Sequence, residues 1–418
     1  MKVKIINKKL SSRDADISEI AETDIVEKPL SYYTDRIENT LNRQKGNYLS
    51  IQGATITPIP YWCIEFETIE KKFQGDLINQ PNKKDGRFIA RTAREATGVK
   101  GTGQQKEKWR HSIIQGPVSE DSLFSVVSSS WLAPFTITNR YLVFIPAILS
   151  SEGKLVLLKD VAREDKMENW INPQTPSHPE IVKWVKEIQQ KWYKNKTPKS
   201  FKLVTERLNY HHTLVNQKPK SIRLVYTRSR FLKAAVLNPQ EKTAFGLPLN
   251  KVVLTMRRGI EIIKSLTIPL SGTIVDNMLH YIEVKSVDEA YWLSGLFNSI
   301  SFQNLVIEES GGKRGPEYVP SIYTIPAKIL NRRNLIFDPT DPTHMKISDI
   351  AKLLEAEMSI VAKNYLNNEK KIPIDRIDDT IVSPMIPLSH AGVHIDRLKN
   401  TRSQDIDKLN NLVKSLLI

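Results

Sequence analysis

The alternation of apolar and polar residues indicates strands through most of the first 285 residues. Segments rich in β-branched and aromatic residues are expected as strands; they read GNYLSIQGATITPIPYWCIEFETI, SLFSVVSSSWLAPFTI, RYLVFIPAIL, KLVLLKDV, SIRLVYT, KAAVL and the stretch 251–284. Within the last stretch we expect one strand from Thr273 to Val284. The polar stretch with Gly86, Gly98 and Gly101 is interpreted as a long loop.

Apolar residues at helical spacing predict a helix within 177–196. Ser177 and Glu180 form a capping box, and Pro179 lies in the first turn. One face carries Ile181, Trp184, Val185, Ile188 and Trp192. We expect these tryptophans to belong to the core rather than to a platform that stacks bases.

A second helix is expected after the strand that ends at Val284. Ser286 and Glu289 form an S-x-x-E capping box, and the helical spacing continues to an expected end near residues 298–299. Beyond the segment FDPTDPTH two further amphipathic helices are expected. Their apolar faces carry Ile347, Ile350, Leu354, Met358 and Val361 in one case and Ile406, Leu409, Val413 and Leu416 in the other.

Strand segments followed by helical segments predict an α+β fold, with a mixed, sheet-rich body and a helical C-terminal region. We expect residues 1–40 to form a polar N-terminal tail or docking segment. The body spans 41–345 and is expected to contain two sub-lobes, 41–175 and 176–345. The helical region covers 346–418.

Composition narrows the cellular setting. The 418 residues are 40% hydrophobic, and Cys63 is the single cysteine, so an internal disulfide framework is excluded and a reducing compartment is indicated. The N-terminal residues lack the apolar run of a signal peptide, and no segment has the length and apolarity of a membrane-spanning helix. We therefore expect a cytoplasmic protein with no membrane contact.

The positive charge is concentrated in two stretches. The formal net charge is +15, and residues 79–110 carry nine basic against three acidic residues. Residues 191–233 carry twelve basic residues against Glu206 alone, so the rest of the chain is close to neutral. This distribution is typical of a face that binds a polyanion, although clustering in sequence can also be ordinary solvated charge.

Candidate polyanion contacts follow from these stretches and from a later basic pair. Lys, Arg and small hydroxyl side chains on accessible loops are the residue types that contact phosphates, and the segment VYTRSRFLKAA offers several between two expected strands. The candidates are Arg87, Arg91, Arg94, Lys106, Lys108, Arg110, Lys196, Lys199, Lys202, Arg228, Ser229, Arg230, Lys233, Lys313 and Arg314.

Catalytic signatures are scarce. The chain contains no P-loop, H-E-x-x-H, paired C-x-x-C or G-x-S-x-G motif. His211, His212, Asp276 and His280 do not have the spacing of a standard metal site, and we expect no metal and no catalytic residue. Asp160, Glu164 and Lys166 follow an apolar run and leave a metal-dependent nuclease as an alternative.

Four stretches stand out in order along the chain; they begin LSIQGATITPIPYWCIEF, ERLNYHHTLVNQKP, GTIVDNMLHYIEVKSVDEAYWLSGLFNS and YTIPAKILNRRNLIFDPTDPTH. Together they resemble the target-recognition half of large N6-adenine DNA methyltransferases, which occur in fused type II restriction-modification and BREX-like phage-defence systems. LSIQGATITPIPYWCIEF resembles the family's GA-T/S-hydrophobic-x-P-R-aromatic stretch, and ERLNYHHTLVNQKP with IRLVYTRSRFLKAAVL resembles its NYxxKLxxQ and VVYNxSGxxLAAAV segment. GTIVDNMLHYIEVKSVDEAYWLSGLFNS and YTIPAKILNRRNLIFDPTDPTH resemble the next two motifs. The resemblance covers about residues 45–360.

The departures from the family pattern concern its chemistry. About 40 residues precede the first match, where the family places its methyl-donor pocket and its N-P-P-Y/F motif. Asn172-Pro173 and Asn238-Pro239 continue without the aromatic residue that stacks on an extruded adenine. Ile59 replaces an arginine of the first motif, and Arg230 replaces a glycine of the second.

The resemblance thus implies a target-recognition domain over 41–345 that binds double-stranded DNA as the specificity subunit of a separately encoded, S-adenosylmethionine-dependent adenine methyltransferase. A nuclease or helicase is a further expected partner. We expect no cofactor in this chain and no catalysis by it alone, and the partner is expected to dock on the N-terminal segment or the helical end. The alternatives are the metal-dependent nuclease and a non-catalytic structural or inhibitory protein of a defence complex.

Overall fold

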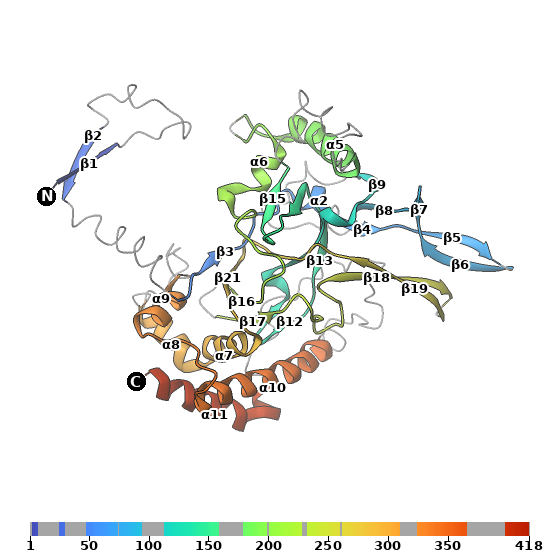
Figure 1. Ribbon diagram of the computed structural model, residues 1–418. Coiled ribbons are helices and arrows are strands. Elements are labelled where there is room, and N and C mark those ends of the chain that lie inside the picture. The colour runs from blue at the N-terminus through green and yellow to red at the C-terminus, as the bar shows by residue number, and fades with distance from the viewer. Residues whose placement is uncertain are drawn as a thin grey trace. The chain divides into compact units, whose positions relative to one another are not determined.

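The computed structural model (Figure 1) describes residues 2–6, 25–29, 47–73, 75–93, 113–158, 179–198, 200–227, 232–259, 261–309, 324–365 and 398–417. The chain divides into two units, Met1–Leu49 and Ser50–Ile418. In the first unit, which contains the expected polar tail, strand β1 (Lys2–Ile6) pairs antiparallel with β2 (Ile25–Pro29).

A seven-stranded sheet forms the centre of the second unit. Its order is β20-β10-β13-β4-β8-β7, and β9 pairs with β8. All neighbours are antiparallel except β10 and β20. The bounds are β4 (Cys63–Phe66), β7 (Lys83–Lys84), β8 (Arg87–Thr92), β9 (Gln115–Pro117), β10 (Leu123–Val127), β13 (Tyr141–Phe144) and β20 (Thr273–Val275). Because β20 joins strands from the first third of the chain, the expected division at residue 175 does not follow a break in the sheet.

A second, four-stranded antiparallel sheet has the order β17-β16-β21-β3. Its strands are β3 (Ile51–Gln52), β16 (Arg223–Thr227), β17 (Ala234–Leu237) and β21 (Leu279–Glu283). Val225, Leu279 and Tyr281 of this sheet share a buried core with Val127 and Val275 of the first. The two sheets therefore pack against each other through a common apolar core.

The expected single strand from Thr273 to Val284 is two strands in different sheets. Asp276 makes the turn between them, because its side chain accepts a hydrogen bond from the backbone N–H of Met278 at 2.9 Å and its carbonyl accepts one from Leu279 at 2.9 Å. The β-branched content of the stretch indicated strand correctly, but it carries no information about the sheet that each half joins.

Short ladders and helices lie in the connections between these strands. They are the strand pairs β11 (Leu132–Ala133) with β12 (Thr136–Ile137) and β14 (Ala147–Leu149) with β15 (Leu155–Leu157), and the short helices α2 (Ile59–Trp62), η4 (Glu120–Ser122), η5 (Ser129–Trp131), α6 (Val204–Leu208) and η8 (Tyr210–His212).

Helix α5 (Pro179–Asn195) confirms the helix expected within 177–196. Its tryptophan face is buried, as predicted. Trp184 donates its indole N–H to the Tyr61 carbonyl at 3.1 Å and packs edge-on against Phe144, with ring centroids 5.4 Å apart. These side chains are core and are not available to stack on bases.

The remaining helices gather at the C-terminal end of the second unit (Figure 1). They are α7 (Val287–Asn298), α8 (Ile300–Glu309), α9 (Ile325–Arg332), α10 (Pro342–Asn364) and α11 (Lys399–Leu417). The predicted cap of α7 is confirmed, because Ser286 Oγ accepts a hydrogen bond from the Glu289 N–H at 3.1 Å. The predicted α+β class with a helical C-terminal region is also confirmed, but the helices begin at Val287, well before residue 346.

Helix α7 packs between strand β17 of the second sheet and helix α10. The Asn298 side chain exchanges two hydrogen bonds with the backbone of Ala234 in β17, at 2.7 and 3.0 Å. On its other side a Cβ at Gly295 would lie 2.7 Å from Ile347 of α10, so glycine is required where these helices approach. Within the described ranges no helix combines the length and apolarity needed to cross a bilayer.

Candidate functional site

Two β-hairpins from distant parts of the sequence form a sheet of their own. Strands β5 (Thr68–Phe73) and β6 (Asp76–Pro81) make one hairpin, and β18 (Lys251–Arg258) and β19 (Glu261–Pro269) make the other. The order is β19-β18-β6-β5, and we call this the hairpin sheet. In Figure 1 both hairpins extend away from the remainder of the second unit.

Local sequence explains each hairpin. Gly75 and Gly259 lie in the two turns with φ of +94° and +58°, a backbone region that costs glycine little. Strand β18 pairs with β6 through Arg257 opposite Asn79, and an ion pair of 3.3 Å joins Arg258 to Asp76 beside the turns. The two tips are therefore held next to each other.

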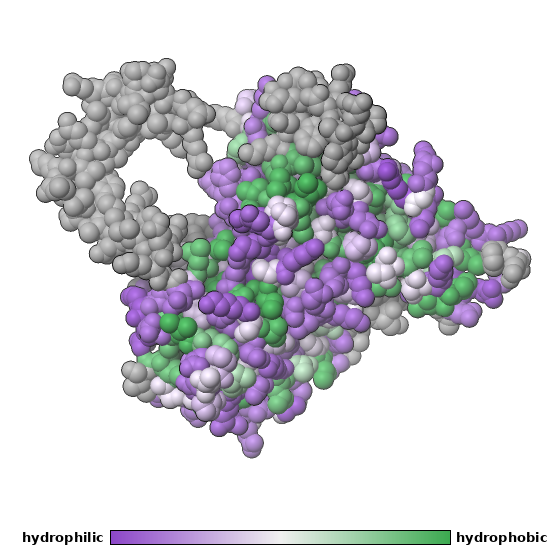
Figure 2. Space-filling model, in the orientation of Figure 1, coloured by the Kyte–Doolittle hydropathy of each residue, from purple (hydrophilic) through white to green (hydrophobic). Residues whose placement is uncertain are grey.

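The hairpin sheet is not a core sheet. Most residues of β19 are exposed, and so are most of β5. Leu77 is 58% exposed and Ile262 is 52% exposed. Figure 2 shows hydrophobic residues among hydrophilic ones on the hairpins. Such an ordered but accessible pair of hairpins is typical of a binding element carried on a rigid scaffold.

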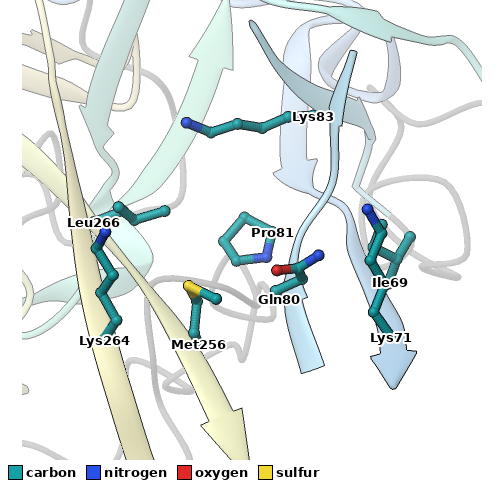
Figure 3. Close-up of a pocket in the computed structure, with 8 residues that line it drawn as sticks. All are labelled: Ile69, Lys71, Gln80, Pro81, Lys83, Met256, Lys264 and Leu266. Carbon is teal, nitrogen blue, oxygen red and sulfur yellow. The ribbon is translucent and has the colours of Figure 1, made fainter. Parts of the chain in front are cut away.

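One face of the hairpin sheet contains a pocket of about 240 Å³ (Figure 3). Register explains how it forms, because Ile69 pairs with Gln80 and Met256 pairs with Lys264, so side chains of all four strands meet on this face. The lining residues are Ile69, Lys71, Gln80, Pro81, Lys83, Met256, Lys264 and Leu266.

The charged residues that line the pocket are all positive. Three of the eight lining residues are lysines, and none of the eight is acidic. The Lys83 ammonium lies 4.1 Å from the centroid of the Phe88 ring, which fixes its position by a cation–π contact. Counted over 68–84 and 251–269, the hairpin segments carry eight basic against three acidic residues. The face can therefore attract an anion.

The opposite face of the hairpin sheet is also basic. Lys72 lies opposite Leu77, and Arg257 lies opposite Ile262. The Arg257 Nε donates a hydrogen bond to Thr255 Oγ1 at 3.0 Å, which orients the guanidinium. The sheet thus presents cations on both faces and exposed aliphatic side chains near its tips.

Two predicted contacts on β8 are engaged with carboxylates. Arg87 is exposed and forms an ion pair with the buried Glu180 of α5. Arg91 is half-buried, and its Nε donates to Glu65 Oε1 at 2.6 Å. Arg87 thus links β8 to α5 and Arg91 links β8 to β4, so only the exposed part of Arg87 is available to a ligand.

The predicted contacts of the second basic stretch do not form one cluster in the described residues. Lys196 is half-buried after α5, and Lys202 is exposed. Lys233 is 8% exposed, and burial lowers the pKa of its ammonium. Its expected role as a phosphate contact stays a prediction, although the residue lies in the interior next to strand β17.

The other predicted contacts lie outside the described residues. These are Arg94, Lys106, Lys108, Arg110, Lys199, Arg228, Ser229, Arg230, Lys313 and Arg314. The alternative nuclease residues Asp160, Glu164 and Lys166 also lie outside them.

Sequence reasoning missed two features, the β7–β8 hairpin of the seven-stranded sheet and the lysines that meet on the hairpin sheet. The polar stretch interpreted as a loop contains β7 and β8, and Asp85 and Gly86 connect them with positive φ of 52° and 79°. Asp-Gly between strands is the signature of a two-residue hairpin turn, so this signal was readable. Lys71 and Lys264 fall outside both basic stretches, and only tertiary pairing brings them together.

Buried polar groups elsewhere serve the fold. Ser50 Oγ lies 2.5 Å from the Tyr226 hydroxyl and 3.2 Å from His280 Nδ1. Tyr141 donates to Asp276 at 3.3 Å, and burial raises the pKa of the Asp276 carboxyl to about 6. No described group of three or more His, Cys, Asp or Glu residues is arranged to hold a metal ion.

Comparison with known proteins leaves the hairpin sheet as the basis for a functional assignment. The chain matches no model of a known protein family. A search of curated proteins finds no significant match.

Proposed function

We propose that this chain binds double-stranded DNA as the sequence-recognition subunit of a separately encoded adenine methyltransferase in a restriction-modification or phage-defence system of the cytoplasm. The methyl donor, S-adenosylmethionine, would be bound by that partner. The observation that carries the DNA-binding part is the accessible hairpin sheet with cations on both faces. The motif resemblance supplies the methyltransferase part.

The hairpin sheet carries side chains suited to duplex recognition. Each of its two hairpins is a two-stranded ribbon, the kind of element that the major groove of B-DNA admits. Lys71, Lys72 and Lys264 are exposed and are suited to phosphate contacts, which supply affinity but no sequence information. Asn79 lies on the face of β6 opposite the pocket, and a carboxamide of this kind pairs with adenine edges.

Salt dependence tests the DNA-binding proposal. The double variant Lys71→Ala with Lys264→Ala removes two phosphate contacts, so we expect the slope of log affinity against log salt to fall by about 2. Affinity would be measured by fluorescence anisotropy with a labelled duplex from low to moderate salt. The matched control is Lys154→Ala with Lys218→Ala, which removes two lysines that pair with Glu152 and Glu283.

The control is expected to keep the wild-type slope. If both double variants reduce the slope equally, the effect is one of net charge and the hairpin sheet is not the DNA face. If the wild-type chain shows no salt-dependent binding to duplex DNA, with or without the partner, the proposed function is wrong.

A further inference from the structure

The floor of the hairpin-sheet pocket is apolar and still accessible. Ile69, Met256 and Leu266 are half-buried although they line a concavity between two ordered hairpins. Pro81 is buried and closes the floor next to Gln80. Apolar side chains that remain reachable at the bottom of a pocket favour a ligand with a flat or apolar body.

The rim of the pocket, in contrast, is positively charged. Lys71, Lys83 and Lys264 come from three different strands, and in Figure 3 their side chains stand around Pro81, Gln80 and Met256. A ligand that satisfies both regions must combine an apolar or aromatic body with a negative charge at its edge. The Gln80 carboxamide adds one donor group and one acceptor to the wall of the pocket.

Size restricts the ligand further. The volume of about 240 Å³ is on the order of that of one nucleotide. A base in a duplex is covered on both faces by its neighbours, so it can reach the apolar floor only after it has left the stack.

We propose that this pocket holds one unstacked nucleotide, with its base against Met256 and Leu266, its edge at Gln80 and its phosphate among the three lysines. Lysine supplies the charge as a compact donor, and the side chains of Met256 and Leu266 supply apolar contact for the base. The inference rests on the proposed function only for the source of the nucleotide, which is either the bound DNA or free nucleotide in solution.

Fluorescence of the base analogue 2-aminopurine tests the pocket. A duplex with one unpaired 2-aminopurine is compared with the same duplex fully paired, and deoxyadenosine monophosphate provides the free-nucleotide arm. We expect the wild-type chain to bind the duplex with the unpaired base about 10-fold more tightly, because base contacts are lost when the base stays paired. The analogue's emission should change on binding, since its neighbours change.

The pocket variant is Met256→Ala with Gln80→Ala, which removes one side chain from the floor of the pocket and one from its wall but changes no charge. It is expected to lose the preference for the unpaired base while it keeps the wild-type affinity for the paired duplex. The control is Leu77→Ala, which removes an exposed aliphatic residue from the opposite face and should keep the preference.

The outcomes separate the inference from the proposed function. If the chain binds no duplex but binds deoxyadenosine monophosphate in a manner that needs Met256 and Gln80, the pocket stands, the nucleotide is a free one, and the proposed function fails. If duplex binding occurs with no preference for the unpaired base and the free nucleotide does not bind, the pocket proposal is overturned. A preference that survives the pocket variant also overturns it.

Discussion

At the scale of single residues, the buried carboxyl of Asp276 links the stability of the fold to pH. Asp276 turns the chain between β20 and β21 and accepts hydrogen bonds from Met278 and Tyr141. Burial raises the pKa of its carboxyl from 3.8 to about 6, because desolvation disfavours the charged form more than these two hydrogen bonds favour it. The neutral acid therefore stabilises the folded state.

The sign of the resulting pH dependence follows directly. Below about pH 4 Asp276 is protonated in both states and its stabilising effect is complete. Between pH 4 and 6 the unfolded chain releases the proton and the folded chain retains it, so the free energy of unfolding falls as pH rises. The loss is on the order of 3 kcal/mol once the pH exceeds the folded pKa.

We expect Asp276→Asn to remove this component. Urea denaturation at several pH values should show the wild-type protein losing stability relative to the variant from pH 4 to 7, because the amide does not titrate. Asp407→Asn, which removes an exposed carboxylate, should follow the wild-type profile. Parallel profiles for wild type and Asp276→Asn would contradict the burial argument.

At the scale of elements, the four-residue capping box from Ser286 to Glu289 predicted where helix α7 begins. Ser286 accepts from Glu289 N–H at 3.1 Å, and Glu289 accepts from the Lys285 N–H at 2.7 Å, so the side chains of the motif satisfy backbone groups that the helix cannot. The helix joins the β16–β17 sheet to α10, so its stability affects the whole second unit.

Loss of the cap should therefore be measurable in global unfolding. Ser286→Ala is expected to lower the free energy of unfolding by about 1 kcal/mol, since one backbone N–H loses its acceptor. Ser286→Asp should restore most of it, because a carboxylate caps equally well and favours the positive end of the helix dipole. Thermal and urea denaturation measure both, and equal stability of all three proteins would refute the capping role.

At the scale of the whole molecule, a candidate partner surface lies on the helical end rather than on the hairpin sheet. Leu353 and Ile360 are seven residues apart on α10, hence on one helix face, and are 43% and 54% exposed. Exposed apolar side chains of this kind are suited to the buried core of a protein interface. This location agrees with the sequence expectation of docking at the helical end, which stays a prediction.

Substitutions on this face of α10 are expected to separate partner binding from DNA binding. Leu353→Glu with Ile360→Glu should abolish co-purification of the adenine methyltransferase and site-specific methylation by the mixture, while DNA binding by this chain is unchanged. Labelled methyl transfer to plasmid DNA provides the assay. Val156→Glu, which places a carboxylate at an exposed aliphatic position of β15, is the control and should keep both.

Two results would contradict the proposal that this chain is a recognition subunit. One is methyl transfer by this chain without a partner. The other is equal methylation of the same sites when the chain is left out.

Sequence alone determined the elements whose signals are local. The α5 face with Trp184, the Ser286 cap and the faces of α10 and α11 follow from 3.6-residue spacing and capping, which depend on residues a few positions apart. The α+β class followed from their order. The Asp85-Gly86 turn was equally local but was obscured by the polar residues around it.

Only the tertiary structure decided which strands pair and which side chains are buried or brought together. It divided Thr273 to Val284 between two sheets, buried Lys233, and brought Lys71 and Lys264 together across the hairpin sheet. Strand pairing and burial depend on contacts between residues that are distant in the chain, and these leave no periodic signal in the sequence. Charge clustering in sequence therefore indicated a polyanion partner but not the surface best suited to bind it.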